Sequence, residues 1–348
     1  MTKLGNSTIF EMIHDYLKIY LPKQRKVSPD TIHSYQKALE LLVDFVKDKK
    51  KIPLQDVTFE MLTAEMIIFY LDYIETERGC SITTRNNRLS SIRAFLVYAA
   101  NRDVTTVVAL NELTKVPLKP ITVKAVEYMS LAAITAIVEQ ADILTPNGLR
   151  DCVFILLMYD TGARIQEMID IKLCDLNLGK TPTVTLNGKG NKVRSVPLME
   201  KTAIHLQKYL SEFHKGFLYN VSAPLFYSVI HNKQNPLTAR RIRYILKEYG
   251  ERAREVCPEV PKRIYPHLFR HSRAMHLYQN GMDLILISQW LGHSQLETTQ
   301  IYAHADTEQK RKAIAAATPK NDPLHKRLSP DRFTVTDEDT LKRLSGLR

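Results

Sequence analysis

The spacing of apolar residues predicts a chain that is mostly helical. Apolar side chains recur every three or four positions through most of the sequence, and this spacing places them on one face of a helix. Ser28, Pro29 and Asp30 form a typical helix start before the second such stretch. The helices predicted in this way cover residues 9–20, 30–45, 64–76, 83–100, 130–141, 149–159, 202–213, 238–255, 266–279 and 284–291.

A hairpin of strands is predicted in the second half of the chain. Residues 184–186 and 193–197 are rich in Val and flank 187–191, a turn segment with two glycines. Two short apolar stretches around such a turn are typical of a β-hairpin. The fold class that follows is mainly α, with a short antiparallel sheet.

The pattern also predicts two domains. Residues 101–125 are rich in Thr and Val, contain Pro117 and Pro120, and show no sustained helical period. Such a stretch between two periodic regions is typical of an interdomain linker. The predicted organisation is a helical domain over 1–105, a linker over 106–125, a second domain over 126–318 and a polar, proline-interrupted tail over 319–348.

The charge balance indicates an anionic partner. The chain has 49 Lys and Arg against 37 Asp and Glu, a formal net charge of +12. A strongly basic protein of this size is typical of nucleic-acid binding, with a membrane surface as the second interpretation. The longest apolar runs are much shorter than a membrane span, so no membrane association is expected.

Cysteine usage indicates a reducing compartment. The four cysteines are widely spaced, without a C-x-x-C pair, at Cys80, Cys152, Cys174 and Cys257. This spacing argues against a disulfide scaffold and against a cysteine-based zinc finger. The N-terminus has helical periodicity and lacks the pattern of a signal peptide, so a cytoplasmic protein is expected.

Five short motifs in the second half carry residues suited to chemistry on an anion. They cover 161–167, 188–198, 266–271, 290–294 and 298–304. The set has no paired carboxylates of the glycosidase type and no Ser or Cys nucleophile elbow. Arg side chains match the non-bridging oxygens of a phosphodiester, Tyr can form a covalent intermediate, and Lys can protonate a leaving alkoxide. Since Arg and Lys supply the positive charge, no metal or other cofactor is required.

In chain order these residues resemble the signature of the tyrosine recombinases, the integrase family of site-specific DNA recombinases. The signature residues match Arg164, Lys189, His267, Arg270, His293 and Tyr302. The motif resemblance covers about 130–313, and residues 9–100 resemble the helical, SAM-like core-binding domain of that family. It implies a SAM-like N-terminal domain followed by a mixed, mostly helical catalytic domain. Because the chain begins almost directly with the core-binding helices, we expect a simple type, similar to Xer recombinases or to the integrases and transposases of mobile elements.

The resemblance implies a role for each matched residue. Tyr302 would attack the scissile phosphate and form a 3′-phosphotyrosine, and a 5′-hydroxyl of a second duplex would later reverse that step. Arg164 and Arg270 would hold the non-bridging oxygens. Lys189 would protonate the leaving 5′-oxygen, and His267 would be the base for the tyrosine. His293 would donate to the phosphate, and Glu167 would orient the cations. No ATP is implied, because bond energy is conserved.

Other interpretations remain open. A type IB topoisomerase-like enzyme would share the chemistry without needing a second duplex, and a non-catalytic DNA-binding regulator would share the fold. A metal-dependent nuclease is a third alternative, because His267 and His271 have a metal-ligand spacing. Arg270 between them would repel a cation, so we expect no metal site.

DNA contacts are predicted in both domains. The predicted DNA-facing side chains are Arg85, Asn86, Arg88, Arg93, Lys192, Arg240, Arg241 and Arg243, with a solvated basic surface as the alternative for the last three. Lys192 and Arg194 compete with Lys189 for the acid role, and we expect them to touch phosphates or solvent instead.

The resemblance also predicts the partners. These are double-stranded DNA with specific recombination sites, a homotetramer on two duplexes, and an accessory protein or partner recombinase. Residues 313–317 would dock on a neighbouring protomer. Such a protein would lie in the cytoplasm, at the bacterial nucleoid when bound to DNA.

Overall fold

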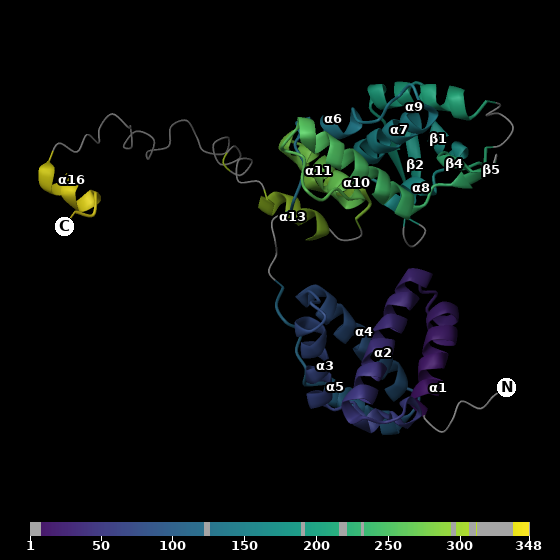
Figure 1. The fold of residues 1–348 in the computed structure, drawn as a ribbon, viewed down its shortest axis with the longest axis vertical. Coiled ribbons are helices and arrows are strands. Elements are labelled where there is room, and N and C mark those ends of the chain that lie inside the picture. Colours follow the sequence, from purple (N-terminus) through teal and green to yellow (C-terminus); the bar gives the residue numbers. More distant parts are fainter. Residues whose placement is uncertain are drawn as a thin grey trace. The chain divides into compact units, whose positions relative to one another are not determined.

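The computed structural model describes residues 8–121, 126–188, 192–215, 221–230, 233–293, 297–305, 311 and 337–347. The chain divides into two compact units, Met1–Val123 and Lys124–Arg348. Helices dominate both of them, and the strands that the structure describes lie in the second unit (Figure 1). Within the described ranges, no helix combines the length and the apolar character needed to cross a membrane.

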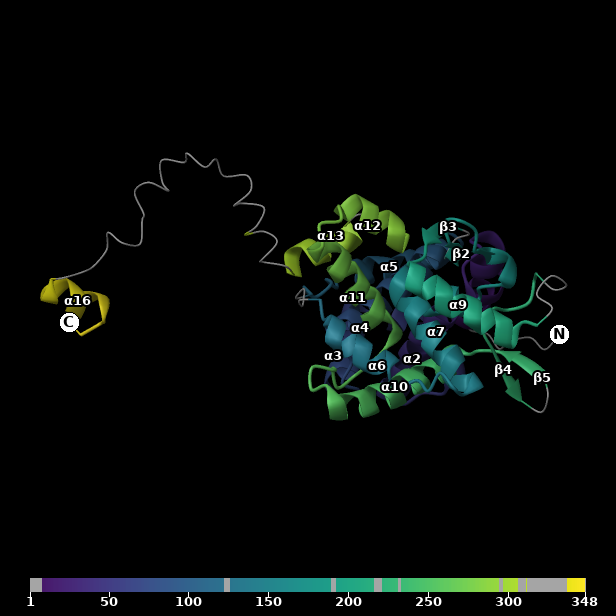
Figure 2. The same ribbon diagram turned by 90° about the horizontal axis from the view of Figure 1, so that it is seen from above.

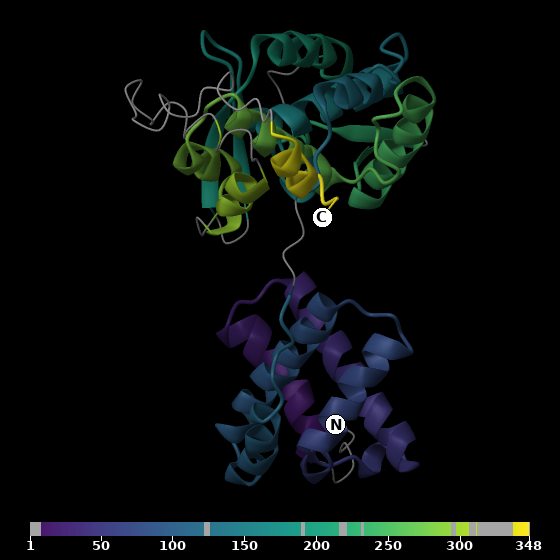
Figure 3. The same ribbon diagram turned by 90° about the vertical axis from the view of Figure 1, so that its left-hand side faces the viewer.

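The N-terminal unit is a helical bundle around an aromatic core. Its longer helices are α1 (Thr8–Asp15) with a π-helical continuation (Tyr16–Gln24), α2 (Pro29–Lys50), α3 (Ala64–Thr76), α4 (Ile82–Ala100) and α5 (Val107–Thr114). The hydroxyls of Thr63 and Ser81 accept backbone N–H bonds at the starts of α3 and α4. The rings of Tyr16, Tyr70 and Phe95 are fully buried. Figure 3 shows the helices of this unit, coloured purple to blue, from a second side.

Helix α5 corrects the predicted linker. Ala109, Leu113 and Val116 are buried in the core of the N-terminal unit. The prediction of a linker over 106–125 is therefore wrong for the stretch from α5 to Val116. The Thr- and Val-rich composition hid a helix of two turns, which is stabilised by packing against α4 rather than by its own propensity.

The C-terminal unit is built around α7 (Pro146–Thr161), which is buried along most of its length. The other helices of this unit are α6 (Leu131–Val138), α8 (Ile165–Ile169), α9 (Glu200–Phe213), α10 (Ala239–Val256), α11 (Pro266–Gln279), α12 (Leu284–Leu291) and α13 (Glu297–Ala305). Helices α9 and α11 pack against α7, and α12 and α13 pack against α11 (Figure 2). A further helix, α16 (Glu338–Leu344), lies within the predicted tail.

Two small antiparallel sheets complete this unit. The predicted hairpin is confirmed as β2 (Thr183–Gly188) and β3 (Lys192–Pro197), and β1 (Leu176–Asn177) pairs with the outer edge of β2. The second sheet consists of β4 (Tyr227–Ile230) and β5 (Lys233–Pro236). The sequence did not predict β1, β4 or β5, because β1 is only two residues long and β5 is polar and exposed throughout.

Candidate active site

Arg164 lies at the turn between α7 and α8. Gly162 ends α7 with φ of +60°, a left-handed conformation that favours glycine, and Arg164 is the N-cap residue of α8. The backbone N–H of Arg164 donates to Glu167 Oε2 at 2.9 Å, and its Nη1 donates to Glu167 Oε1 at 2.7 Å. The Arg164 side chain keeps 35% of its surface exposed. Its remaining N–H groups can therefore reach an anion.

Glu167 is the buried carboxylate of the site, and it holds a second guanidinium. Arg194 Nη2 donates to Oε2 at 2.7 Å, and Arg194 Nη1 donates to Oε1 at 3.2 Å. Burial by itself would raise the pKa of Glu167, but the bonds and charges of Arg194 and Arg164 bring that pKa down to about 2. Our expectation that Arg194 faces phosphates or solvent is wrong, because its side chain is only 12% exposed.

Arg270 connects the turn between α7 and α8 to the end of α12 through two hydrogen bonds. It lies on α11 with 3% of its surface exposed, and it donates to the carbonyl of Gly162 at 2.7 Å and to that of Leu291 at 2.8 Å. Burial and the positive charges of Arg164 and Arg194 lower the pKa of Arg270 to about 10. The guanidinium is therefore still charged at neutral pH.

Tyr302 lies on α13 and is fully buried. Its hydroxyl is 3.0 Å from Nδ1 of His271, and burial raises the pKa of Tyr302 to about 12. The structure thus brings His271, rather than His267, to the tyrosine hydroxyl. His267 lies one turn earlier on α11, is exposed, and has its ring 6.4 Å from that of His271. The sequence signal for His271 was its position directly after Arg270.

His293 follows the end of α12. Gly292 ends that helix with φ of +64°, and Nδ1 of His293 lies 2.8 Å from Oγ1 of Thr299 at the start of α13. Burial, together with the charges of Arg270 and Arg164, lowers the pKa of His293 to about 4. Without a bound anion, this histidine is neutral at physiological pH.

The predicted Lys189 lies outside the described residues, as do 313–317. The hairpin that carries Lys189 closes with the pair Gly188 and Lys192. A Cβ at Gly188 would be 3.1 Å from Oε1 of Glu167, so the hairpin leaves the sheet directly beside this carboxylate. Lys192 is exposed.

The predicted DNA-facing side chains differ in exposure. Arg85 and Asn86 are buried, so the expectation that they form part of an exposed face is wrong. Arg85 Nε lies 3.5 Å from a carboxylate oxygen of Glu75, and Asn86 exchanges two hydrogen bonds with the backbone of Lys119. Arg88 and Arg93 are half-buried. The three members of the set on α10 are exposed, namely Arg240, Arg241 and Arg243.

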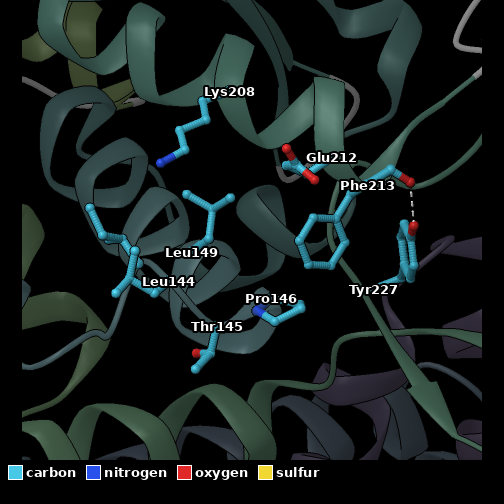
Figure 4. Close-up of a pocket in the computed structure, with 9 residues that line it drawn as sticks. Leu144, Thr145, Pro146, Leu149, Lys208, Glu212, Phe213 and Tyr227 are labelled. Atoms are coloured by element: carbon cyan, nitrogen blue, oxygen red, sulfur yellow. Dashed lines mark hydrogen bonds between the residues drawn. The ribbon is translucent and has the colours of Figure 1, made fainter.

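A separate pocket of the C-terminal unit contains no predicted site residue. Leu144 and Leu149 lie on one side of it, Phe213 and Tyr227 lie on the other, and Lys208 lies above the two leucines (Figure 4). Its walls are mostly apolar. None of the residues that line this pocket belongs to the five motifs.

The arrangement is suited to an anion rather than to a metal. Arg164 and Arg194 bind one carboxylate, that of Glu167, and Arg270 adds a third positive charge nearby. Partial desolvation and neighbouring positive charge lower the pKa values of three histidines, which are His267, His271 and His293. Over the described ranges, no cluster of three or more His, Cys, Asp or Glu has metal-binding geometry. The donor set fits a phosphate group beside a tyrosine hydroxyl.

Comparisons with known proteins agree with this geometry. Residues 127–309 match the phage integrase family, and residues 13–103 match the phage integrase N-terminal SAM-like domain. A putative integrase/recombinase y4rC from Sinorhizobium fredii is 31% identical over 92% of this chain and 94% of its own length. Tyrosine recombinase XerD from Staphylococcus haemolyticus is 29% identical over 86% of this chain and 96% of its own length.

Solved structures show the same fold. A XerH site-specific recombinase bound to its difH substrate has a TM-score of 0.60 at 23% identity, over 88% of each chain. A Tn1549 transposon integrase in complex with a circular intermediate DNA has a TM-score of 0.66 at 17% identity, over 88% of this chain and 99% of its own. The predicted fold class is confirmed, and the chain belongs to the phage integrase family as a site-specific tyrosine recombinase.

Proposed function

We propose that this chain exchanges DNA strands through a covalent 3′-phosphotyrosine at Tyr302. The observation that carries the proposal is the convergence of the Tyr302 hydroxyl, His271, His293 and two guanidiniums around the ends of α7, α11 and α12. The single side chain of Arg270 bonds two carbonyls, those of Gly162 and Leu291. Each carbonyl lies two residues before another member of the site, Arg164 or His293. One rigid link therefore fixes the anion-binding groups relative to one another.

The reaction begins with attack of the Tyr302 oxygen on the scissile phosphorus. The phosphorus–oxygen bond to the 5′-carbon side breaks, and Lys189 gives its proton to the leaving 5′-oxygen. Arg164 and Arg270 stabilise the charge on the non-bridging oxygens, with His293 as a further donor. A 5′-hydroxyl from the second duplex then attacks the phosphotyrosine and releases the Tyr302 hydroxyl, so no nucleotide cofactor is consumed.

The tyrosine needs a proton acceptor and a change of environment. Its pKa of about 12 means that the hydroxyl is neutral in the free protein. His271 is the base in contact with that hydroxyl, while His267 is exposed and faces incoming DNA in this proposal. Since the hydroxyl is buried, DNA binding must expose it before attack.

The partners in this proposal are two duplexes with specific recombination sites and three further copies of this chain. The XerH and Tn1549 integrase structures contain DNA, and the net charge of +12 supports an anionic partner here as well. The exposed Arg240, Arg241 and Arg243 would contact the phosphate backbone. A protein with these partners would act in the cytoplasm, at the nucleoid.

Covalent trapping tests the function. The full chain is mixed in EDTA with nicked duplexes spanning the DNA beside its own gene, and denaturing gels detect a protease-sensitive adduct. We expect the wild type and Tyr278→Phe to form the adduct and Tyr302→Phe to bind the same DNA without forming it. An adduct that persists in Tyr302→Phe, or that requires a divalent metal, would contradict the proposal.

A further inference from the structure

Arg194 lies where three parts of the site meet, although the mechanism above does not use it. Its Nε donates to the carbonyl of Trp290 at 3.0 Å, and its two Nη atoms donate to Glu167 at 3.2 and 2.7 Å. The residue itself is on β3, the strand that leaves the hairpin of Lys189. One guanidinium thus joins the hairpin, helix α8 and the end of α12.

The contacts of Glu167 are shared unequally between two arginines. Arg194 binds both carboxylate oxygens as a fork, whereas the Arg164 side chain reaches only Oε1, through one nitrogen. The carboxylate is 4% exposed, so its charge needs a protein partner. Because Arg194 supplies that partner, the remaining donors of Arg164 stay free for a phosphate.

Arg194 also packs against the backbone that leads to His293. A Cβ built on Gly292 would lie 3.0 to 3.3 Å from Nη1, Cδ and Cζ of Arg194. The guanidinium therefore covers the turn between Trp290 and His293 directly. A shorter or uncharged side chain at this position would leave that turn without its bond to β3.

We propose that Arg194 is a positioning residue that neutralises Glu167 and thereby keeps Arg164 available to the scissile phosphate. This inference rests on the proposed function, since it assigns Arg194 a part in the same reaction. Without Arg194, the buried carboxylate would have Arg164 as its remaining guanidinium partner. A bidentate pair between those two would then turn the Arg164 fork away from the DNA.

A double-variant experiment tests this role. Single-turnover formation of the Tyr302 adduct is measured at saturating protein on a nicked duplex, alongside the Kd for that duplex. We expect Arg194→Gln to slow adduct formation roughly 100-fold, the scale of a misplaced catalytic group, with little change in Kd. Glu167→Gln in the same chain removes the carboxylate that captures Arg164, so the double variant should react faster than Arg194→Gln alone.

The matched control is Arg254→Gln. Arg254 of α10 also donates to two backbone carbonyls, those of Val260 and Pro261, and none of the described carboxylates is paired with it. It should leave the adduct rate unchanged. If the wild type forms the adduct and the double variant is as slow as Arg194→Gln, or if Arg194→Gln reacts at the wild-type rate, the inference fails while the proposed function stands. No wild-type adduct would overturn both.

Discussion

At the scale of the residue, His293 links the charge of the site to the stability of the fold. Its pKa is lowered from 6.5 to about 4, so between those pH values the unfolded chain binds the proton and the folded chain does not. Falling pH in that window therefore favours unfolding. Replacing His293 by Asn, which does not titrate, should make the melting temperature fall less between pH 6.5 and 4.5. The flattening is partial, because burial also lowers the pKa of His271.

Thermal unfolding followed by circular dichroism at several pH values measures this effect. The exposed His33 of α2 provides the comparison. His33→Asn should keep the wild-type pH dependence. An equal slope in the two variants would show that His293 does not carry the lowered pKa.

At the scale of the element, the turn from α7 to α8 determines where Arg164 lies. Gly162 has φ of +60°, and a Cβ there would be 2.8 Å from Cδ2 of the buried Leu291. Gly162→Ala should lower the free energy of unfolding by roughly 2–5 kcal/mol, the sum of left-handed strain and overpacking. Gly281→Ala, also at positive φ but with nothing within 4 Å, should show the strain alone.

Urea unfolding of both variants separates the two contributions. Gly162→Ala should also slow adduct formation, because Arg270 bonds the carbonyls of both Gly162 and Leu291. Equal destabilisation by the two substitutions would mean that Leu291 moves aside without cost.

At the scale of the whole molecule, the net charge of +12 should appear in the salt dependence of DNA binding. Changing the exposed Arg240, Arg241 and Arg243 to Gln should reduce the slope of log K against log salt by about 2.7, since each phosphate contact contributes about 0.9. The comparison is a triple Lys→Gln variant at 47, 49 and 50 on α2, which makes the same change in net charge. If both triple variants reduce the slope equally, the α10 arginines do not contact phosphates.

Much of the fold followed from local pattern. Helices α3, α11 and α12 have the predicted bounds, because the helical spacing of apolar residues is contained in a few neighbouring positions. Helix α5 and strands β1, β4 and β5 were missed. Strand β1 is only two residues long and β5 is polar and exposed, so neither has the apolar pattern of a strand. Helix α5 is stabilised by packing against α4, which its own composition does not indicate.

The sequence by itself determined the family chemistry, since the order and spacing of Arg164, His267, Arg270, His293 and Tyr302 are local facts of the chain. The tertiary structure alone decided the pairing within the site. It placed His271 at the Tyr302 hydroxyl, Arg194 on Glu167, and Arg85 and Asn86 in the interior. Hydrogen bonds between residues 27 or 31 positions apart depend on how helices and strands pack, and packing is a property of the whole unit.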